Sequence, residues 1–113
     1  MSIHSSELLK GTLQTILLKL LADHGKMYGY EITQKVNELS GGTILLTEGS
    51  LYPSLHRLEA EGYLQTDIVK IGKRVRKYYA LTPAGLNTVR ERVQEFTAFL
   101  QTMITVLNIQ PIV

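Results

Sequence analysis

Apolar residues recur every three or four positions over the first third of the chain, which is the spacing of helices with one buried face. The spacing predicts a helix over residues 6–24, capped by Ser5 or Ser6 and followed by Gly25. It predicts a second helix over residues 28–40, ended by two glycines. The buried face of this second helix is expected to carry Ile32, Val36 and Leu39.

A third helix is expected within residues 47–61, ended by Gly62. Its buried face is expected to carry Leu51, Leu55 and Leu58. Pro53 conflicts with a start at Thr47, because a proline deep within a helix removes one hydrogen bond and clashes with the preceding turn. We therefore predict that the helix effectively starts at Gly49, or that its first turn is distorted.

Two segments rich in aromatic and β-branched residues, 63–70 and 75–82, predict a β-hairpin with Gly72 in its connection. Alternation predicts two same-face pairs, Leu64 with Ile68 and Tyr79 with Leu81. An apolar run at residues 43–46 predicts a brief strand. Residues 24–27 are predicted to be a short connection between the first two helices.

A last helix begins at Thr82 and Pro83, a capping residue followed by a proline at the first helical position. Its apolar residues alternate between spacings of three and four over three heptads. They are Leu86, Val89, Val93, Phe96, Leu100, Met103 and Leu107. Pro111 is predicted to end the helix. This seam is too apolar for the surface of a monomer, so we expect a homodimer built on it.

The 113 residues are 44% apolar and 19% charged, which is typical of one globular domain. The net charge is only +2, but six basic residues and no acidic residue lie between Asp67 and Glu91. One interpretation is a solvated hairpin tip. The other is contact with a polyanion, most simply a phosphate backbone. The basic residues of the hairpin chosen as candidates are Lys73, Arg74, Arg76 and Lys77.

Enzymatic chemistry finds little support in this sequence. There is no cysteine, and the three histidines are scattered without metal-ligand spacing. The pair Gly72-Lys73 is followed by Arg74, so it does not form a P-loop motif. We expect no catalytic residue, no metal and no cofactor. No membrane-spanning segment or secretory signal is visible, so we expect a cytoplasmic protein without membrane contact.

Three short helices, a basic-tipped hairpin and a long helix are the element order of a winged helix-turn-helix. The predicted fold class is therefore mainly α with a small β-hairpin and a long C-terminal dimerisation helix. Residues 1–82 would form the DNA-binding domain and residues 83–113 the dimerisation helix, together one compact unit. In this fold the third helix enters the major groove and the hairpin, or wing, touches the flanking backbone. The short connection at residues 70–73 predicts limited reach into the minor groove.

The outward face of the third helix follows from 100° per residue, with the leucines turned inward. The recognition-helix candidates are Gly49, Ser50, Tyr52, Pro53, His56 and Arg57. Gly49 would allow close approach. Arg57 would read a guanine edge or grip a phosphate, and the alternative is a surface ion pair with Glu61. Tyr28, at the start of the second helix, and Lys35, within it, are phosphate-contact candidates, although core packing is the alternative for Tyr28.

Several motifs resemble the PadR family of bacterial transcriptional regulators. They are Glu7–Leu13, Tyr28–Ile32, Gly49–Pro53 followed by Leu55, Arg57, Leu58 and Glu59, and a last set comprising Arg74, Arg76, Lys77, Tyr78, Tyr79, Leu81, Thr82 and Gly85. The resemblance covers residues 7–85, and the single last helix is similar to the short-tailed branch of the family. It implies a dimeric DNA-binding protein, usually a repressor, whose first and last helices form the dimer. It also implies that Tyr52 and Pro53 are shaped for docking on DNA.

Some family members bind planar aromatic effectors near the dimer interface. Phe96 and Phe99 would line such a pocket here, and ordinary packing is the alternative. We thus predict a homodimeric repressor that binds double-stranded DNA at an inverted-repeat operator and is released by a small aromatic effector. The alternative is a winged-helix module that binds another protein and no DNA.

Overall fold

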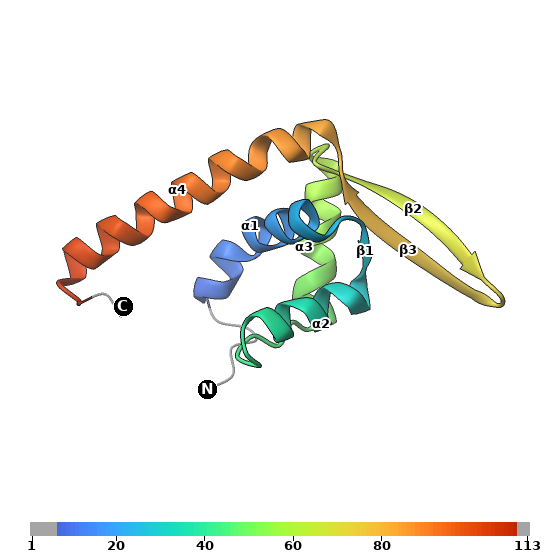
Figure 1. Cartoon of the computed structure of the whole chain (residues 1–113), viewed down its shortest axis with the longest axis horizontal. Coiled ribbons are helices and arrows are strands. Elements are labelled where there is room, and N and C mark those ends of the chain that lie inside the picture. The colour runs from blue at the N-terminus through green and yellow to red at the C-terminus, as the bar shows by residue number, and fades with distance from the viewer. Residues whose placement is uncertain (1–6, 111–113) are drawn as a thin grey trace.

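The computed structural model describes residues 7–110 and contains four helices and a three-stranded antiparallel sheet (Figure 1). The elements in chain order are α1 (Glu7–His24), β1 (Met27–Tyr28), α2 (Gly29–Leu39), α3 (Glu48–Ala60), β2 (Leu64–Ile71), β3 (Arg74–Leu81) and α4 (Pro83–Leu107). No helix within residues 7–110 is long and apolar enough to cross a membrane. The expected caps Ser5 and Ser6 lie outside the described residues.

The core is built around α1, which is buried by α2 and α3 on its sides and by the first turns of α4. Its members are Leu9, Leu13, Leu17, Leu18, Leu20, Leu21, Met27, Ile32, Val36, Leu51, Leu55, Leu58, Leu64, Tyr79 and Val89. The predicted leucine face of α3 is thereby confirmed. Leu39 was predicted to be buried but is 63% exposed, because it occupies the last turn of α2 at the rim of an apolar groove.

The sheet contains a strand that the sequence did not predict. Met27 and Tyr28, assigned to a connection and to a helix start, form β1 and pair with Tyr79 and Tyr78 at the edge of β3. Conversely, the strand expected at residues 43–46 is absent, with only an isolated bridge at Ile44. Side chains at the end of α2 bond to Ile44 instead: its amide donates to the hydroxyl of the capping residue Ser40 at 2.9 Å, and its carbonyl accepts from the Asn37 side-chain amide at 3.4 Å.

The start of α3 differs from the prediction that favoured Gly49. Thr47 is the cap: its hydroxyl accepts from the Ser50 amide at 3.2 Å, and its carbonyl accepts from the Leu51 amide at 2.9 Å. The first turn is therefore regular, and Pro53 lies inside the helix. The helix tolerates it because a proline here removes only the one bond to the Gly49 carbonyl, at an exposed position near the helix start.

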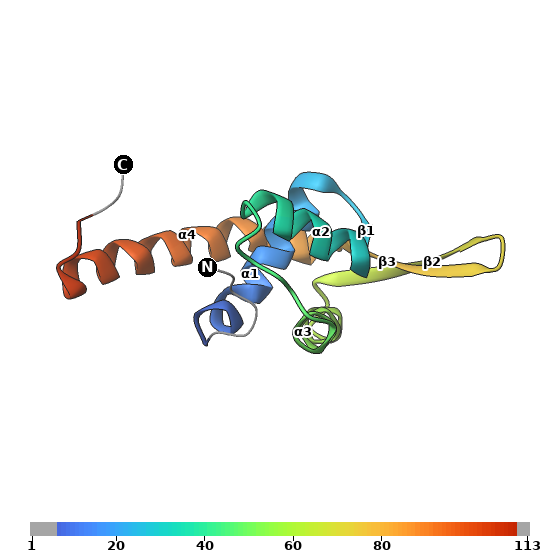
Figure 2. The ribbon, with the colours of Figure 1, turned by 90° about the horizontal axis from the view of Figure 1, so that it is seen from below.

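The hairpin and α4 project from the body in opposite directions (Figures 1 and 2). A two-residue turn with Gly72 at φ +61° joins β2 to β3, as a tight hairpin requires. Leu64 is buried, whereas Ile68 on the same face is exposed because the hairpin has left the body by that point. α4 ends at Leu107 with Asn108 in the left-handed conformation, so its end does not depend on Pro111, which lies outside the described residues.

The start of α4 is fixed against the loop that precedes β2. The Thr82 hydroxyl accepts from the Gly85 amide at 3.1 Å and donates to the Gly62 carbonyl at 2.6 Å. Gly85 is buried so tightly that a Cβ there would overlap the carbonyl oxygen of Tyr63. A glycine is thus required by contact between two backbones.

We expect Gly85→Ala to lower the free energy of unfolding by about 1–3 kcal/mol, because backbone must move to admit the methyl group. Gly11→Ala is the matched control, since no atom lies within 4 Å of a Cβ at that helical position. Alanine also has the higher helix propensity, so the control should be neutral or slightly stabilising. Denaturant unfolding of both variants measures the difference, and equal stabilities would contradict the overlap.

Candidate nucleic-acid interface and the apolar face of α4

The outer face of α3 is open to solvent, as the helical geometry predicted. Gly49, Pro53, His56 and Ala60 are all exposed, opposite the buried leucines. Ser50 is half-buried, and its hydroxyl donates to the Thr47 carbonyl at 3.1 Å. The Ser50 side chain therefore belongs in part to the helix cap, whereas the other outward residues have free space around them.

Tyr52 links α3 to the start of α2. A Cβ on Gly29 would overlap the hydroxyl of Tyr52, so the glycine makes room for this ring. The ring also lies 6.2 Å from the imidazole of His56, measured between centroids. Tyr52 is half-buried as a result, and it fixes the angle between the two helices while His56 stays exposed.

Arg57 is 75% exposed in its side chain and lies at the flank of α3. Its Nε is 3.9 Å from the carboxylate of Glu61, which is the ion pair given as the alternative interpretation. A pair this long and this exposed contributes little to stability. The guanidinium is therefore available to another partner.

A hollow of about 370 Å³ lies where α2, α3 and β3 meet. Tyr28, Tyr52, His56, Arg76 and Lys77 are among the residues that line it. The guanidinium carbon of Arg76 is 4.5 Å from the centre of the Tyr28 ring, a cation–π arrangement. The free amides at the start of α2 open beside this hollow, so cations, aromatic rings and a helix N-terminus share one place.

Other side chains of α2 reduce the attraction of its N-terminus for anions. The Glu31 carboxylate accepts from the Tyr28 amide at 3.2 Å, which brings a negative charge to the helix start. Tyr30 is exposed, and its ring stacks beside that of Tyr28 at 6.5 Å. Lys35 lies farther along and pairs with Glu38 at 3.6 Å. Tyr28 is half-buried, so its burial fits both phosphate contact and core packing, the two roles considered for it.

The wing separates its basic residues onto two faces. Arg74 and Arg76 lie on one face, directly across from Ile71 and Val69. Lys77 lies on the other face, where its ammonium is 3.9 Å from the Glu59 carboxylate of α3. Lys73 is in the turn. Of the basic residues of the wing, Lys77 has an ion pair within the described residues, whereas Lys70, Lys73, Arg74 and Arg76 have none.

Sequence reasoning missed Lys26. The pairing of β1 with β3 brings its ammonium to 3.3 Å from Asp67 and 5.6 Å from the ring centre of Tyr78. A two-residue strand leaves no periodic signal in the sequence, so this neighbour of the wing could not be identified.

Tyr79 of β3 is a core residue. Burial raises the pKa of its hydroxyl, and the nearby Glu59 adds to the effect. Tyr79 is therefore a neutral core residue.

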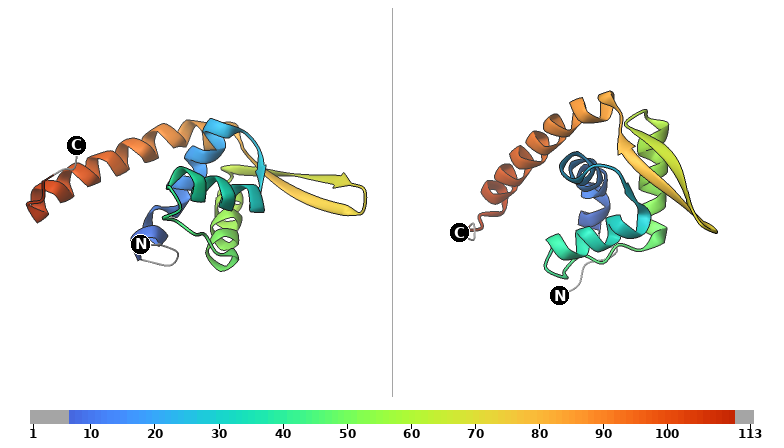
Figure 3. Two further views of the ribbon diagram at one scale, coloured as in Figure 1. Left: turned by 60° about the horizontal axis from the view of Figure 1, so that its bottom comes forward. Right: turned by 45° about the vertical axis from the view of Figure 1, so that its right-hand side comes forward.

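The predicted seam of α4 is only partly covered by α1. Val89 is buried and Val93, Phe96 and Met103 are half-buried, but Leu100 and Leu107 are exposed as the helix runs beyond the body (Figure 3). Leu86 is also exposed. On α1, Leu8 is 82% exposed beside this surface. The molecule thus carries an apolar strip along α4 and the start of α1 that the rest of residues 7–110 does not cover.

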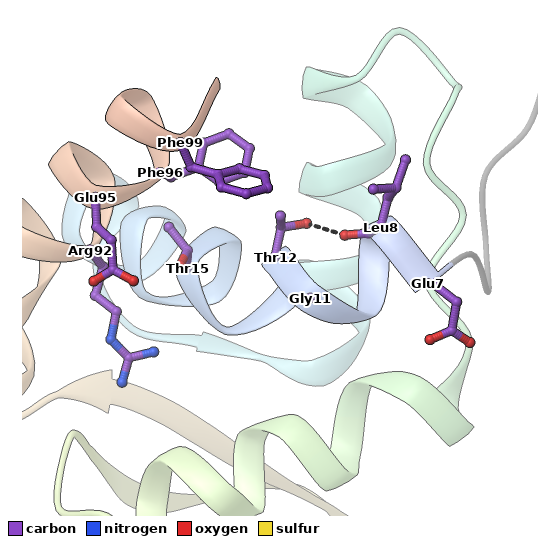
Figure 4. A pocket seen from close by; sticks show the side chains of 9 residues that line it. All are labelled: Glu7, Leu8, Gly11, Thr12, Thr15, Arg92, Glu95, Phe96 and Phe99. Atoms are coloured by element: carbon purple, nitrogen blue, oxygen red, sulfur yellow. Dashed lines mark hydrogen bonds between the residues drawn. The ribbon is translucent and has the colours of Figure 1, made fainter. Parts of the chain in front are cut away.

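A cavity of about 590 Å³ lies between α1 and α4 (Figure 4). Phe96 and Phe99 stand together on its α4 side, with Leu8, Thr12 and Thr15 on the α1 side. The two phenylalanines therefore line one cavity, as the effector hypothesis required. Among residues 7–110 no group of three or more acidic or histidine side chains is arranged to hold a metal ion.

Comparison with known proteins agrees with this arrangement. A profile of the Transcriptional regulator PadR-like family matches residues 17–91. A transcriptional regulator of Mycobacterium tuberculosis is 39% identical over 70 residues, which are 62% of this chain and 63% of that protein. An uncharacterized protein of Lysinibacillus sphaericus is 32% identical over 94 residues, which are 80% of this chain and 84% of that protein.

Solved structures extend the likeness to the whole fold. A transcriptional regulator from Clostridium thermocellum superimposes with a TM-score of 0.81 at 28% identity, over 91% of this chain and 97% of that one. A PadR family regulator from Eggerthella lenta gives 0.73 at 29% identity, over 89% and 82%. These neighbours confirm the predicted winged-helix fold, and the chain belongs to the PadR-like family of transcriptional regulators.

Proposed function

We propose that this regulator is a homodimeric repressor that binds double-stranded DNA at an inverted repeat. The observation that carries the proposal is the shared hollow of α2, α3 and β3, beside which Gly49, Pro53 and His56 on the outer face of α3 are exposed to solvent. A helix whose inner face is buried, whose outer face is exposed to solvent and which has basic side chains beside it suits insertion into a major groove.

Side-chain chemistry suggests which residues contact bases and which contact phosphates. His56 and Arg57 on α3 would reach base edges, with Gly49 and Pro53 keeping the approach close. Lys73, Arg74 and Arg76 would contact phosphates, which fix position but carry no sequence information. Lys77 would act through Glu59 by holding the wing against α3, rather than by contact with DNA.

Dimerisation is supported by the uncovered strip on α4 and α1. A second copy would bury Leu8, Leu100 and Leu107 together with the cavity between the helices. A two-fold axis places two copies of α3 on one face of the duplex, about one helical turn or a multiple apart. An aromatic effector held by Phe96 and Phe99 would then change the angle between the copies and release the operator.

We expect Leu100→Glu to convert the dimer to a monomer or to aggregate, because a buried unpaired charge would replace apolar contact at the interface. Leu45→Glu is the control: Leu45 is 45% exposed and Leu100 is 46% exposed, but Leu45 lies on the loop before α3. Light scattering at micromolar concentration gives the mass. A wild-type protein that is already a folded monomer would refute the dimer.

Neutralising Arg74 and Arg76 together should weaken binding to every DNA sequence. The slope of log affinity against log salt should flatten by about one unit per lost phosphate contact. Arg90→Gln, on the exposed face of α4, is the control for loss of a positive charge outside the wing. If the slope is the same in the double variant and the wild type, this face of the wing does not meet DNA.

Arg57→Ala should cost about 1–3 kcal/mol of operator affinity and relax base preference at one position per half-site, because a guanidinium can grip a guanine with two bonds. The measurement compares an operator selected from random DNA with a scrambled duplex. Equal losses on both would assign Arg57 to a phosphate. Wild-type affinity for both would remove α3 from recognition, and failure of the wild type to bind any DNA would favour a protein-binding module.

A further inference from the structure

A second cavity, of about 300 Å³, lies between α1, α3 and α4 on the flank of the recognition helix. Its charged lining residues are all basic: Lys10 from α1, Arg57 from α3 and Arg92 from α4. Gln14, Thr15 and Ser54 add amide and hydroxyl groups. Three helices that are far apart in sequence thus direct positive charge and hydrogen-bond donors into one small space.

Arg92 is the part of this lining held most firmly. Its Nη1 donates to the Gln14 side-chain oxygen at 3.3 Å, and its guanidinium carbon lies 5.5 Å from the centre of the Tyr63 ring. Figure 4 shows the guanidinium pointing away from the rings of Phe96 and Phe99. Arg92 is therefore positioned by neutral partners, which orient it without cancelling its charge.

The other two cations are only weakly compensated. Lys10 lies 3.7 Å from Glu7, whose side chain is 92% exposed, and Arg57 lies 3.9 Å from Glu61. Neither carboxylate lines the cavity. Long, exposed pairs of this kind contribute little to stability, so Lys10 and Arg57 remain available to an anion. Glu95 lines the neighbouring cavity together with Arg92.

We propose that this cavity binds a small oxyanion, the phosphate or carboxylate group of a free molecule. The forked guanidinium of Arg92 and the hydroxyls of Thr15 and Ser54 match the lone pairs of such a group. A volume of about 300 Å³ is at the small end of ligand pockets, which fits a small molecule better than a polymer. The site adjoins the aromatic cavity, and Gly11, Thr15 and Arg92 line both.

An anion bound in this cavity would also affect the proposed recognition helix, α3. Arg57 lines the cavity and flanks the outer face of α3, so an anion held inside would draw its guanidinium away from DNA. This second step rests on the proposed DNA-binding function, whereas binding of the anion does not. The anion would accordingly antagonise operator binding.

Titration of the full-length protein with inorganic phosphate at constant ionic strength, with chloride as the reference ion, tests the site. We expect saturable binding by calorimetry and shifts of the Gly11 and Ser54 amide signals in NMR spectra. Lys10→Gln and Arg92→Gln should each weaken binding about threefold to tenfold, the loss expected for one partly exposed charged contact. Arg90→Gln on the same helix as Arg92 should bind as the wild type does. Lys10 is exposed, so its variant remains informative if Arg92→Gln fails to fold.

Absence of saturation, or equal weakening by Arg90→Gln, would overturn the proposal. Operator binding then separates a free anion from a DNA phosphate. If phosphate lowers the operator affinity of the wild type but not of Lys10→Gln, the antagonism stands. If free phosphate does not bind while Lys10→Gln weakens operator binding, the cluster contacts the DNA backbone and the proposal is wrong. If phosphate binds but no DNA does, the anion site stands and the proposed DNA-binding function fails.

Discussion

The burial of one leucine face of α3 against α1 is the interaction on which the other features depend. Leu51, Leu55 and Leu58 are almost wholly removed from solvent, and each such side chain stabilises the fold by about 1.5–3 kcal/mol. Because these three residues point inward, the rotation of the helix is fixed. The same rotation directs His56 outward and Arg57 to the flank, so the core determines which chemistry the surface presents.

A second set of contacts ties the wing to that helix. Glu59 accepts a hydrogen bond from Thr66 at 3.3 Å and faces Lys77 across 3.9 Å, so α3 touches both strands of the hairpin through one carboxylate. Tyr79 fills the core beneath the same region. The basic hairpin is therefore held by α3, although its far end extends into solvent.

Periodic features of this chain were predictable and local exceptions were not. The leucines of α3, the strands of the hairpin and the apolar positions that predicted the last helix repeat over many residues, so one irregular position does not obscure the pattern. The pairing of Met27 and Tyr28 with β3 depends on residues fifty positions away, and two residues carry no alternation. The regular first turn of α3 depends on the Thr47 cap, which outweighs the effect of Pro53. Of the candidate site, the outward residues of α3 followed from helical geometry, but the contact of Tyr52 with Gly29 and the partner of Lys77 needed the tertiary structure.

The close contact of Gly85 with Tyr63 fixes the direction in which α4 leaves the body, so a small change at this pivot is amplified along the helix. The helix has 25 residues and is about 37 Å long at 1.5 Å per residue. A tilt of roughly 10° at the pivot would carry the far end through about 6 Å, close to two base pairs of duplex at 3.4 Å each. In a dimer joined through α4, a single methyl group at the pivot would therefore alter the half-site spacing that the two copies can span, without a change in any residue that faces DNA.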